Sequence, residues 1–277
     1  MLERKYLLPS LRYIVLVAVS LFMAGPILTA FLGSIRTTGE FLAQPFGLPV
    51  SGIHWENYTT ILQSPTFWRA LGNSAYITIA TTLLVVTLAS MLALVFARIR
   101  FTGRSFLFNI LTLGLLFPLV VAILPVFIQI RQFGLLDNVW GVILPLTTFG
   151  MPGAVVILRG FFRAIPNELE DAAYIDGCST FSFFLYILLP LARPAIAAVA
   201  TLQVIYSWNE FLLPLIVLND PNRWPLPLGM MQFQGQFSTD WALIMAYVMI
   251  LIVPAIVFYL FTERFIVTGL TGGELKG

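Results

Sequence analysis

Six long apolar runs dominate the sequence and constrain the fold more than any other feature. They cover roughly residues 13–33, 70–97, 105–130, 139–158, 194–218 and 241–262. A helix needs about 20 mostly apolar residues to cross the hydrocarbon core of a bilayer, and each run is close to that length or longer. The runs 70–97 and 105–130 carry no charged residue. The sequence therefore predicts an all-α integral membrane protein with six transmembrane helices in a single domain, residues 1–277.

The composition supports a membrane protein and argues against several other classes. The chain is 59% hydrophobic and 10% charged, whereas soluble domains carry about 25% charged residues. A net charge of +2 with no basic run makes a nucleic-acid partner unexpected. One cysteine, Cys178, is too few for an internal disulfide or a metal cluster, so we expect it to pack as a small apolar group.

The distribution of basic residues predicts the orientation. Of the 15 Lys and Arg residues, eleven fall on the side that would hold both termini and four on the other. The positive-inside rule therefore places both ends in the cytoplasm. Basic residues before the first run resemble the start of a signal peptide, but the run is too long and no clear cleavage site follows it. We interpret this run as an uncleaved anchor.

Several of the predicted spans contain proline: Pro26, Pro118, Pro125, Pro145, Pro152, Pro214 and Pro254. Proline removes an intrahelical hydrogen bond and tends to kink a helix. Helices that bend around a pathway are one interpretation. Ordinary curvature is the other, because proline is common in membrane helices.

The connection between the fourth and fifth runs, residues 163–193, has a pattern of its own, and we call it the elbow. Asn167 can cap a helix, and Glu170 three residues later would complete a capping box. Gly177 is a natural stop for that helix. Ser179 can cap a second short helix that ends before Pro190. The elbow is thus expected to be two short helices separated by a glycine.

Two roles are open for the elbow on pattern alone. It can insert as a helix into a groove of another protein, or it can rest on lipid headgroups as an amphipathic helix. Surface helices prefer Lys and Arg with large apolar groups, whereas the first elbow helix has several acids and small residues. This difference favours docking on a partner.

The elbow resembles the EAA loop of ABC-importer permeases. The similarity rests on Asp171-Ala172-Ala173, Gly177, Ile187 and Leu189-Pro190 at matching spacing. The family usually has Glu at the position of Asp171 and Ala at that of Cys178. The resemblance implies a coupling helix that sits in a cleft of a cytoplasmic ATPase. The implied ATPase-coupling residues are Glu168, Glu170, Asp171, Ala172, Ala173, Asp176 and Gly177.

Other segments resemble the second permease subunit of maltose-type carbohydrate importers. They are 36–41, Leu48-Pro49, 55–58, Ala97-Arg98, 101–104, 208–211 and the tail 269–277. The resemblance implies the transmembrane subunit of an importer, forming half of the pathway for a sugar or related polyol. Its implied partners are a homologous permease in a heterodimer, two ATPase subunits that hold ATP and Mg, and an extracytoplasmic binding protein. The implied location is a bacterial-type inner membrane.

The chain lacks a G-x-x-x-x-G-K-[ST] phosphate loop, so the energy for transport would come from the partner. We expect this chain to bind no cofactor and to catalyse no reaction. An ion-coupled secondary transporter is the alternative. Such proteins usually carry intramembrane carboxylates or histidines. Only Glu210 meets that description here, and the elbow would have no role. A membrane enzyme is less well supported, because no catalytic motif stands out.

Two further sets of residues are candidate contacts. Asn209 and Glu210, with Trp208 and Gln203, are candidates for the substrate path. Glu210 can instead meet water near the outer surface or pair with a partner subunit, and Trp208 can be an ordinary interfacial aromatic. In the loop 219–240, the candidates for binding-protein contact are Gln232, Phe233, Gln234 and Gln236, with a plain solvated loop as the alternative.

Overall fold

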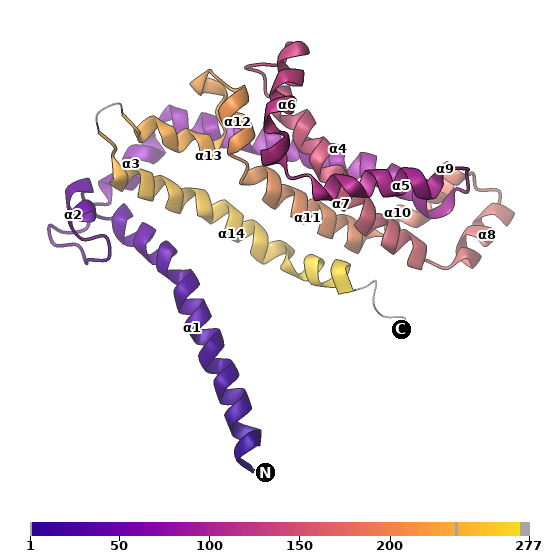
Figure 1. Ribbon diagram of the computed structural model, residues 1–277, viewed down its shortest axis with the longest axis horizontal. Helices are drawn as coiled ribbons and strands as arrows, with labels where there is room; N and C mark the ends of the chain where they lie inside the picture. The colour runs from indigo at the N-terminus through magenta and orange to yellow at the C-terminus, as the bar shows by residue number, and fades with distance from the viewer. Residues whose placement is uncertain (1, 236–237, 272–277) are drawn as a thin grey trace. The chain divides into compact units, whose positions relative to one another are not determined.

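The computed structural model describes residues 2–235 and 238–271, with side chains described for 12–235 and 238–262. Regular structure in these ranges is helical, apart from an isolated β-bridge between Gln234 and Thr239. The α-helices (Figure 1) are α1 (Leu2–Ser34), α2 (Thr38–Ala43), α3 (Glu56–Gln63), α4 (Pro65–Arg98), α5 (Arg104–Leu113), α6 (Leu119–Gln132), α7 (Trp140–Ala164), α8 (Asn167–Ile175), α9 (Thr180–Phe183), α10 (Leu189–Leu191), α11 (Arg193–Trp208), α12 (Leu212–Val217), α13 (Leu226–Gly229) and α14 (Trp241–Thr271). Between them lie the 3-10 turns η1 (Gly114–Leu116), η3 (Pro221–Arg223) and η4 (Met230–Phe233), and the π-helical segment η2 (Phe184–Leu188).

Within the described residues, four helical stretches are long and apolar enough to cross a membrane by themselves. They are Arg12–Ser34, Pro65–Arg98, Trp140–Ala164 and Trp241–Thr262. Two bent helix pairs pass the same test together, Arg104–Leu116 with Leu119–Gln132 and Thr180–Leu191 with Arg193–Trp208. Counting each pair as one span gives six. The prediction of an all-α membrane protein with six spans is confirmed.

The third predicted span, 105–130, is not one continuous helix. Its two halves meet at an angle of 105°. The break falls at Phe117 and Pro118, which both adopt extended backbone conformations. A residue before proline is driven out of the helical region by its clash with the proline ring, and proline itself has no N–H to donate. Of the prolines named above for the predicted spans, Pro118 thus lies at a sharp break.

The fifth predicted span, 194–218, is also interrupted. α11 ends at Trp208, and α12 begins at Leu212 after a break at residues 209–211. At its other end, α11 meets the helical stretch Thr180–Leu191 at an angle of 76°. The apolar stretch of this span therefore includes the second half of the elbow, which the hydropathy pattern had assigned to a separate connection.

The chain divides into two compact units within the described ranges. The first falls within Met1–Trp68 and Met230–Val253, and the second within Arg69–Gly229 and Pro254–Gly277. The prediction that residues 1–277 form a single domain remains a prediction.

In the first unit, the connection after α1 is held by a buried arginine. Arg36 donates to three backbone carbonyl oxygens, those of Leu32 (2.9 Å), Gln44 (2.8 Å) and Pro45 (2.8 Å). A buried guanidinium group needs such acceptors because it has lost its contact with water. The loop between α1 and α3 therefore has a defined structure.

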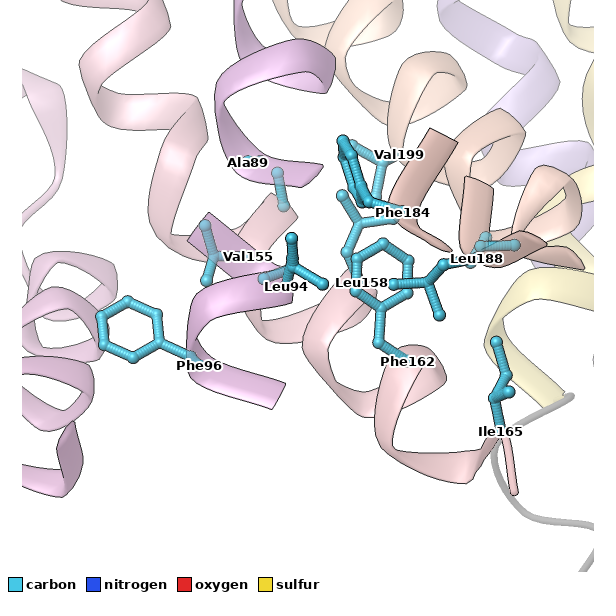
Figure 2. Packing of buried hydrophobic residues seen from close by; sticks show 14 of the residues in the cluster. Ala89, Leu94, Phe96, Val155, Leu158, Phe162, Ile165, Phe184, Leu188 and Val199 are labelled. Atoms are coloured by element: carbon cyan, nitrogen blue, oxygen red, sulfur yellow. The ribbon is translucent and has the colours of Figure 1, made fainter. Parts of the chain in front are cut away.

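In the second unit, a cluster of buried apolar side chains joins α4, α7, the elbow and α11 (Figure 2). Its members include Val85, Ala89, Ala93, Phe96, Val155, Leu158, Phe162, Phe183, Phe184, Leu188, Ala195 and Val199. Ala89 and Ala93 lie four residues apart on one face of α4 and are fully buried. Small residues at this spacing allow helix backbones to approach closely. The elbow thus shares its core with the neighbouring spans.

A second cluster in this unit joins α4, α6, α7 and α12, and includes Ile77, Ile130, Val142, Ile143, Leu146, Leu213 and Val217. Asp137, which has a positive φ of 53°, closes the loop beside it. Its N–H donates to Val217 O (2.8 Å), and its carboxylate accepts from the N–H groups of Asn219 (3.1 Å) and Asp220 (3.0 Å). These bonds tie the loop after α6 to the end of α12.

Candidate functional site at the elbow

The first elbow helix, α8, begins differently from its prediction. Pro166 is its N-cap residue, and no side chain caps it. The expected capping box of Asn167 and Glu170 is therefore wrong. Pro166 already has the extended backbone of a cap residue, which places Asn167 inside the first turn. There the Asn167 carboxamide oxygen accepts from Arg98 Nη1 instead.

Arg98, the last residue of α4, fastens α8 to two spans. Its Nη2 donates to the carbonyl oxygens of Phe162 and Ile165 at the end of α7, both at 2.7 Å. Its Nη1 lies 3.4 Å from Glu170 Oε2, and the two side chains are 4% and 15% exposed. The last carbonyls of a helix lack intrahelical donors, and Arg98 supplies them at α7. One side chain thus connects the ends of α4 and α7 with the start of α8.

Arg98 was not among the site residues predicted from the sequence, although Ala97-Arg98 contributed to the family resemblance. The available signal was its position directly at the end of a span, with a short loop after it and an acidic elbow elsewhere on the same predicted side. Only the folded chain shows which acid it pairs with.

The end of α8 agrees with its prediction. Gly177 has a φ of 84° and follows the C-cap residue Asp176. The Cys178 N–H donates to Ala173 O (2.9 Å), and the Gly177 N–H donates to Tyr174 O (3.1 Å). This pair of bonds is the Schellman motif, which favours glycine because other residues are strained at positive φ. The glycine stop is confirmed.

The predicted coupling residues separate into two groups around α8. Ala173 is 4% exposed and packs into the core cluster. Glu170 points back toward the protein, held by Arg98 and by the Tyr174 hydroxyl (3.0 Å). The exposed members are Glu168, Asp171, Ala172, Asp176 and Gly177. The free face of α8 therefore carries acidic and small residues.

One residue of that free face was missed by sequence reasoning. Ile175 is 85% exposed, although it is large and apolar. It is the last residue of α8, next to exposed Asp176. Ile175 therefore adds a large apolar side chain to the exposed surface of α8.

The second half of the elbow confirms one predicted boundary and corrects another. Ser179 Oγ accepts from the Ser182 N–H at 3.1 Å, so Ser179 caps α9 as predicted. The helix does not end before Pro190. It widens into η2 and continues as α10, which contains Pro190. A wider turn accommodates a residue that lacks an N–H. Cys178 is half-buried against the core cluster, as expected for a small apolar group.

The four candidate substrate-path residues do not share one cavity. Gln203 is 5% exposed, lines a cleft of about 190 Å³ between α7 and α11, and donates to Ser207 Oγ (2.9 Å). Trp208 and Asn209 line another cleft of about 280 Å³ with residues of α4 and α14. Glu210 accepts from the Leu213 N–H at 2.9 Å and so stabilises the start of α12.

The candidate binding-protein contacts lie in the first unit. Gln232 is exposed and accepts from the Thr66 hydroxyl (2.8 Å). The ring of Phe233 is half-buried and packs on Tyr247 with a centroid distance of 5.7 Å. Gln234 is exposed. Gln236 lies outside the described residues, as does the end of the tail, 272–277.

Replacing Gly150 with alanine should loosen the packing of α7 on α11. An added Cβ would overlap Gln203 Oε1 and lie 3.1 Å from Val85 Cγ2. Overpacking of a core costs about 1–3 kcal/mol. Alanine also favours a helix over glycine by about 1 kcal/mol, so we expect the free energy of unfolding of Gly150→Ala to be about 1–3 kcal/mol lower than that of an alanine variant that shares this gain without the overlap. Gly153→Ala is the matched control, because its Cβ would meet only Leu115 Cδ2 at an ordinary 3.7 Å. Thermal unfolding in detergent measures both, and equal melting temperatures would contradict the prediction.

The described part of the chain offers no evident place for a metal ion, since no three His, Cys, Asp or Glu side chains come together there. Its distinctive features are apolar spans and a short helix fastened on one side and free on the other. Together they define a multi-pass membrane protein with a short, partly exposed helix beside its spans.

Comparison with known proteins gives the family. Residues 86–267 match the family described as binding-protein-dependent transport system inner membrane component. The chain belongs to this family and is a permease subunit of such a transport system. The matched range contains both bent helix pairs and the whole elbow.

Similar proteins extend the match over nearly the whole chain. The diacetylchitobiose uptake system permease protein NgcG of Streptomyces coelicolor is 32% identical, over 96% of this chain and 89% of that protein. The trehalose transport system permease protein SugB of Mycobacterium tuberculosis is 35% identical, over 91% and 92%. In fold, the chain is similar to a crystal structure of a bacterial ABC transporter involved in alginate import, with a TM-score of 0.81 over 93% of this chain and 96% of that chain, at 22% identity.

Proposed function

We propose that this chain is the transmembrane subunit of an ATP-binding-cassette importer and that α8 is its coupling helix. The observation that carries the proposal is the attachment of α8 by Arg98 to the ends of α4 and α7. The opposite face of α8, with Ala172 and Ile175, is exposed. A partner that holds this face can therefore move two spans together.

The proposed partner at α8 is a cytoplasmic ATPase, present in two copies that hold ATP and Mg. Acidic residues on the free face favour a cleft with basic residues. Under this assignment, the elbow and both termini of the chain lie in the cytoplasm. The membrane is a bacterial-type inner membrane. A second, homologous permease would complete the pathway as a heterodimer. The family match favours this importer over the ion-coupled alternative.

The proposed substrate is a sugar or a related polyol. Relatives named for diacetylchitobiose and trehalose transport support a carbohydrate, and the family description supports delivery by a binding protein. We propose Gln232, Phe233, Gln234 and Gln236 for contact with that protein. For the substrate path, we propose Gln203 in one cleft and Trp208 with Asn209 in the other, where amide and indole groups can bond to hydroxyls.

Replacing Ala172 with tryptophan tests the proposed docking of α8. Ala172 is exposed, so a large side chain should leave the fold intact while preventing the ATPase from closing around the helix. We expect at least an approximately tenfold loss of ATPase association, equivalent to about 1.4 kcal/mol. Co-purification in mild detergent measures the association, and uptake of labelled sugar measures transport.

Ala43→Trp is the matched control, because Ala43 is also exposed on a short helix but belongs to the first unit. It should keep wild-type association. If Ala172→Trp folds and retains the ATPase like Ala43→Trp, α8 is not the coupling helix.

Replacing Glu210 separates a role in substrate binding from its role at α12. Glu210→Gln keeps an oxygen that can accept from the Leu213 N–H but removes the charge. If Glu210 serves only α12, transport at limiting substrate should stay within about twofold, whereas Glu210→Ala should lose about 1 kcal/mol of stability. A loss of uptake in a stable Glu210→Gln protein would instead place the carboxylate in the substrate path.

A further inference from the structure

A polar hollow of about 530 Å³ lies behind α8, where α8 meets the ends of α4 and α7 and the start of α5. Four arginines and two carboxylates line it: Arg98, Arg100, Arg104, Arg163, Glu170 and Asp171. The charged groups of the lining therefore leave a net positive charge. Nothing in the proposed coupling role of α8 accounts for this excess.

Two of these arginines already bond to other residues of the chain. Arg98 holds Glu170 and the end of α7. Arg104 donates from Nε to Phe96 O (2.9 Å) and from Nη2 to Ala97 O (3.0 Å), at the end of α4. Both guanidinium groups therefore form part of the wall.

The other two arginines, Arg100 and Arg163, are exposed, and no described residue pairs with either side chain. Asp171 also lines the hollow and is likewise unpaired within the described residues. Two free guanidinium groups thus face one free carboxylate. Guanidinium groups present several N–H donors in a fixed plane, which suits the oxygens of a phosphate group.

The hollow opens toward an apolar surface. Arg100 and Arg104 also line an adjoining hollow of about 330 Å³, together with Phe101 and Phe106. From there an exposed stripe runs along α5, made of Phe106, Leu107, Ile110 and Leu113. The described side chains of α5 include no buried residue. A stripe with this spacing on a membrane helix is suited to contact with acyl chains.

We propose that the hollow binds the phosphate of an anionic phospholipid, with its acyl chains along the exposed stripe of α5. A basic pocket that joins an apolar helix face matches both parts of such a molecule, a negative head and a hydrocarbon tail. Free phosphate shares only the head chemistry. This proposal is independent of the ATPase and of the transported substrate, so it can be tested on the permease chain alone.

The test measures lipid retention by the full-length chain in mild detergent. The chain is exposed to mixtures of phosphatidylglycerol and phosphatidylcholine, and bound lipid is quantified by mass spectrometry. We expect preferential retention of phosphatidylglycerol, with roughly a fivefold weaker preference for each arginine removed in Arg100→Gln and Arg163→Gln. The control is Arg131→Gln, an exposed arginine at the end of α6 outside the hollow.

A charge-preserving variant keeps the test decisive if the protein that combines Arg100→Gln with Arg163→Gln fails to fold. Arg100→Lys with Arg163→Lys should retain more than half of the preference. Equal retention of both lipids by the wild type, or an unchanged preference in the Arg100→Gln, Arg163→Gln protein, overturns the proposal. Displacement of the lipid by an equal concentration of inorganic phosphate also overturns it, because the site would then take free phosphate. Loss of ATPase association with lipid preference unchanged would assign the hollow to the ATPase.

Discussion

Arg98→Met should lower the free energy of unfolding by about 3 kcal/mol and separate α8 from the spans. The substitution removes the donor to Phe162 O and Ile165 O and leaves Glu170, which is 15% exposed, without its cation. Removing one partner of a buried ion pair is costly because the other charge remains with little water around it. Chemical denaturation in detergent measures the stability, and ATPase co-purification measures the coupling.

The control for this substitution is Arg193→Met. Arg193 is exposed at the start of α11, so its loss should change stability by no more than about 0.5 kcal/mol. The second variant is the double substitution Arg98→Met with Glu170→Gln. Neutralising the stranded carboxylate should recover about 1 kcal/mol relative to Arg98→Met alone. If Arg98→Met and Arg193→Met are equally stable, Arg98 does not fasten the elbow.

Gly177→Val should reduce ATP-driven transport by about five- to thirtyfold while the spans remain folded. The backbone at Gly177 has a φ of 84°, which costs an L-residue about 1–2 kcal/mol, and a β-branched residue is especially unsuited to it. No atom lies within 4 Å of the added Cβ, so the cost comes from the backbone and not from a clash. The elbow can relieve this strain by rearranging the turn that orients α8.

Two variants isolate this effect. Gly160→Val adds the same side chain at a glycine of α7 that also has open space and no positive φ, and it should keep normal transport. Gly177→Asn should retain most of the transport, because asparagine tolerates the left-handed conformation. Equal transport by Gly177→Val and Gly177→Asn would show that the backbone conformation at this turn is not required for coupling.

Predictions from local sequence were the most successful. The apolar runs located the spans because burial in hydrocarbon depends on the length and composition of each segment alone. Gly177 and Ser179 were correctly assigned to a helix stop and a helix cap, because both roles depend on backbone conformation and hydrogen bonds within a few residues. The cap at Asn167 failed because Arg98, distant in sequence, bonds to its side chain and Pro166 takes the cap position.

The bends were harder to predict for a similar reason. Several of the predicted spans contain proline, yet only the folded chain shows the 105° break beside Pro118. A helix in a membrane can satisfy the carbonyl groups freed by a proline in several ways, and the neighbouring helices decide which is used. The close approach of Gly150 to Gln203 and the cap of α12 by Glu210 likewise depend on packing between segments.

The sequence by itself determined that the chain is a helical membrane protein with six spans and an elbow stopped by a glycine, because hydropathy and backbone preference act over short distances. The tertiary structure decided which face of α8 is free, which acid Arg98 holds, and which arginines are left to face the hollow. These depend on buried charges finding partners across the chain, and a partner far away in sequence leaves no periodic pattern to read.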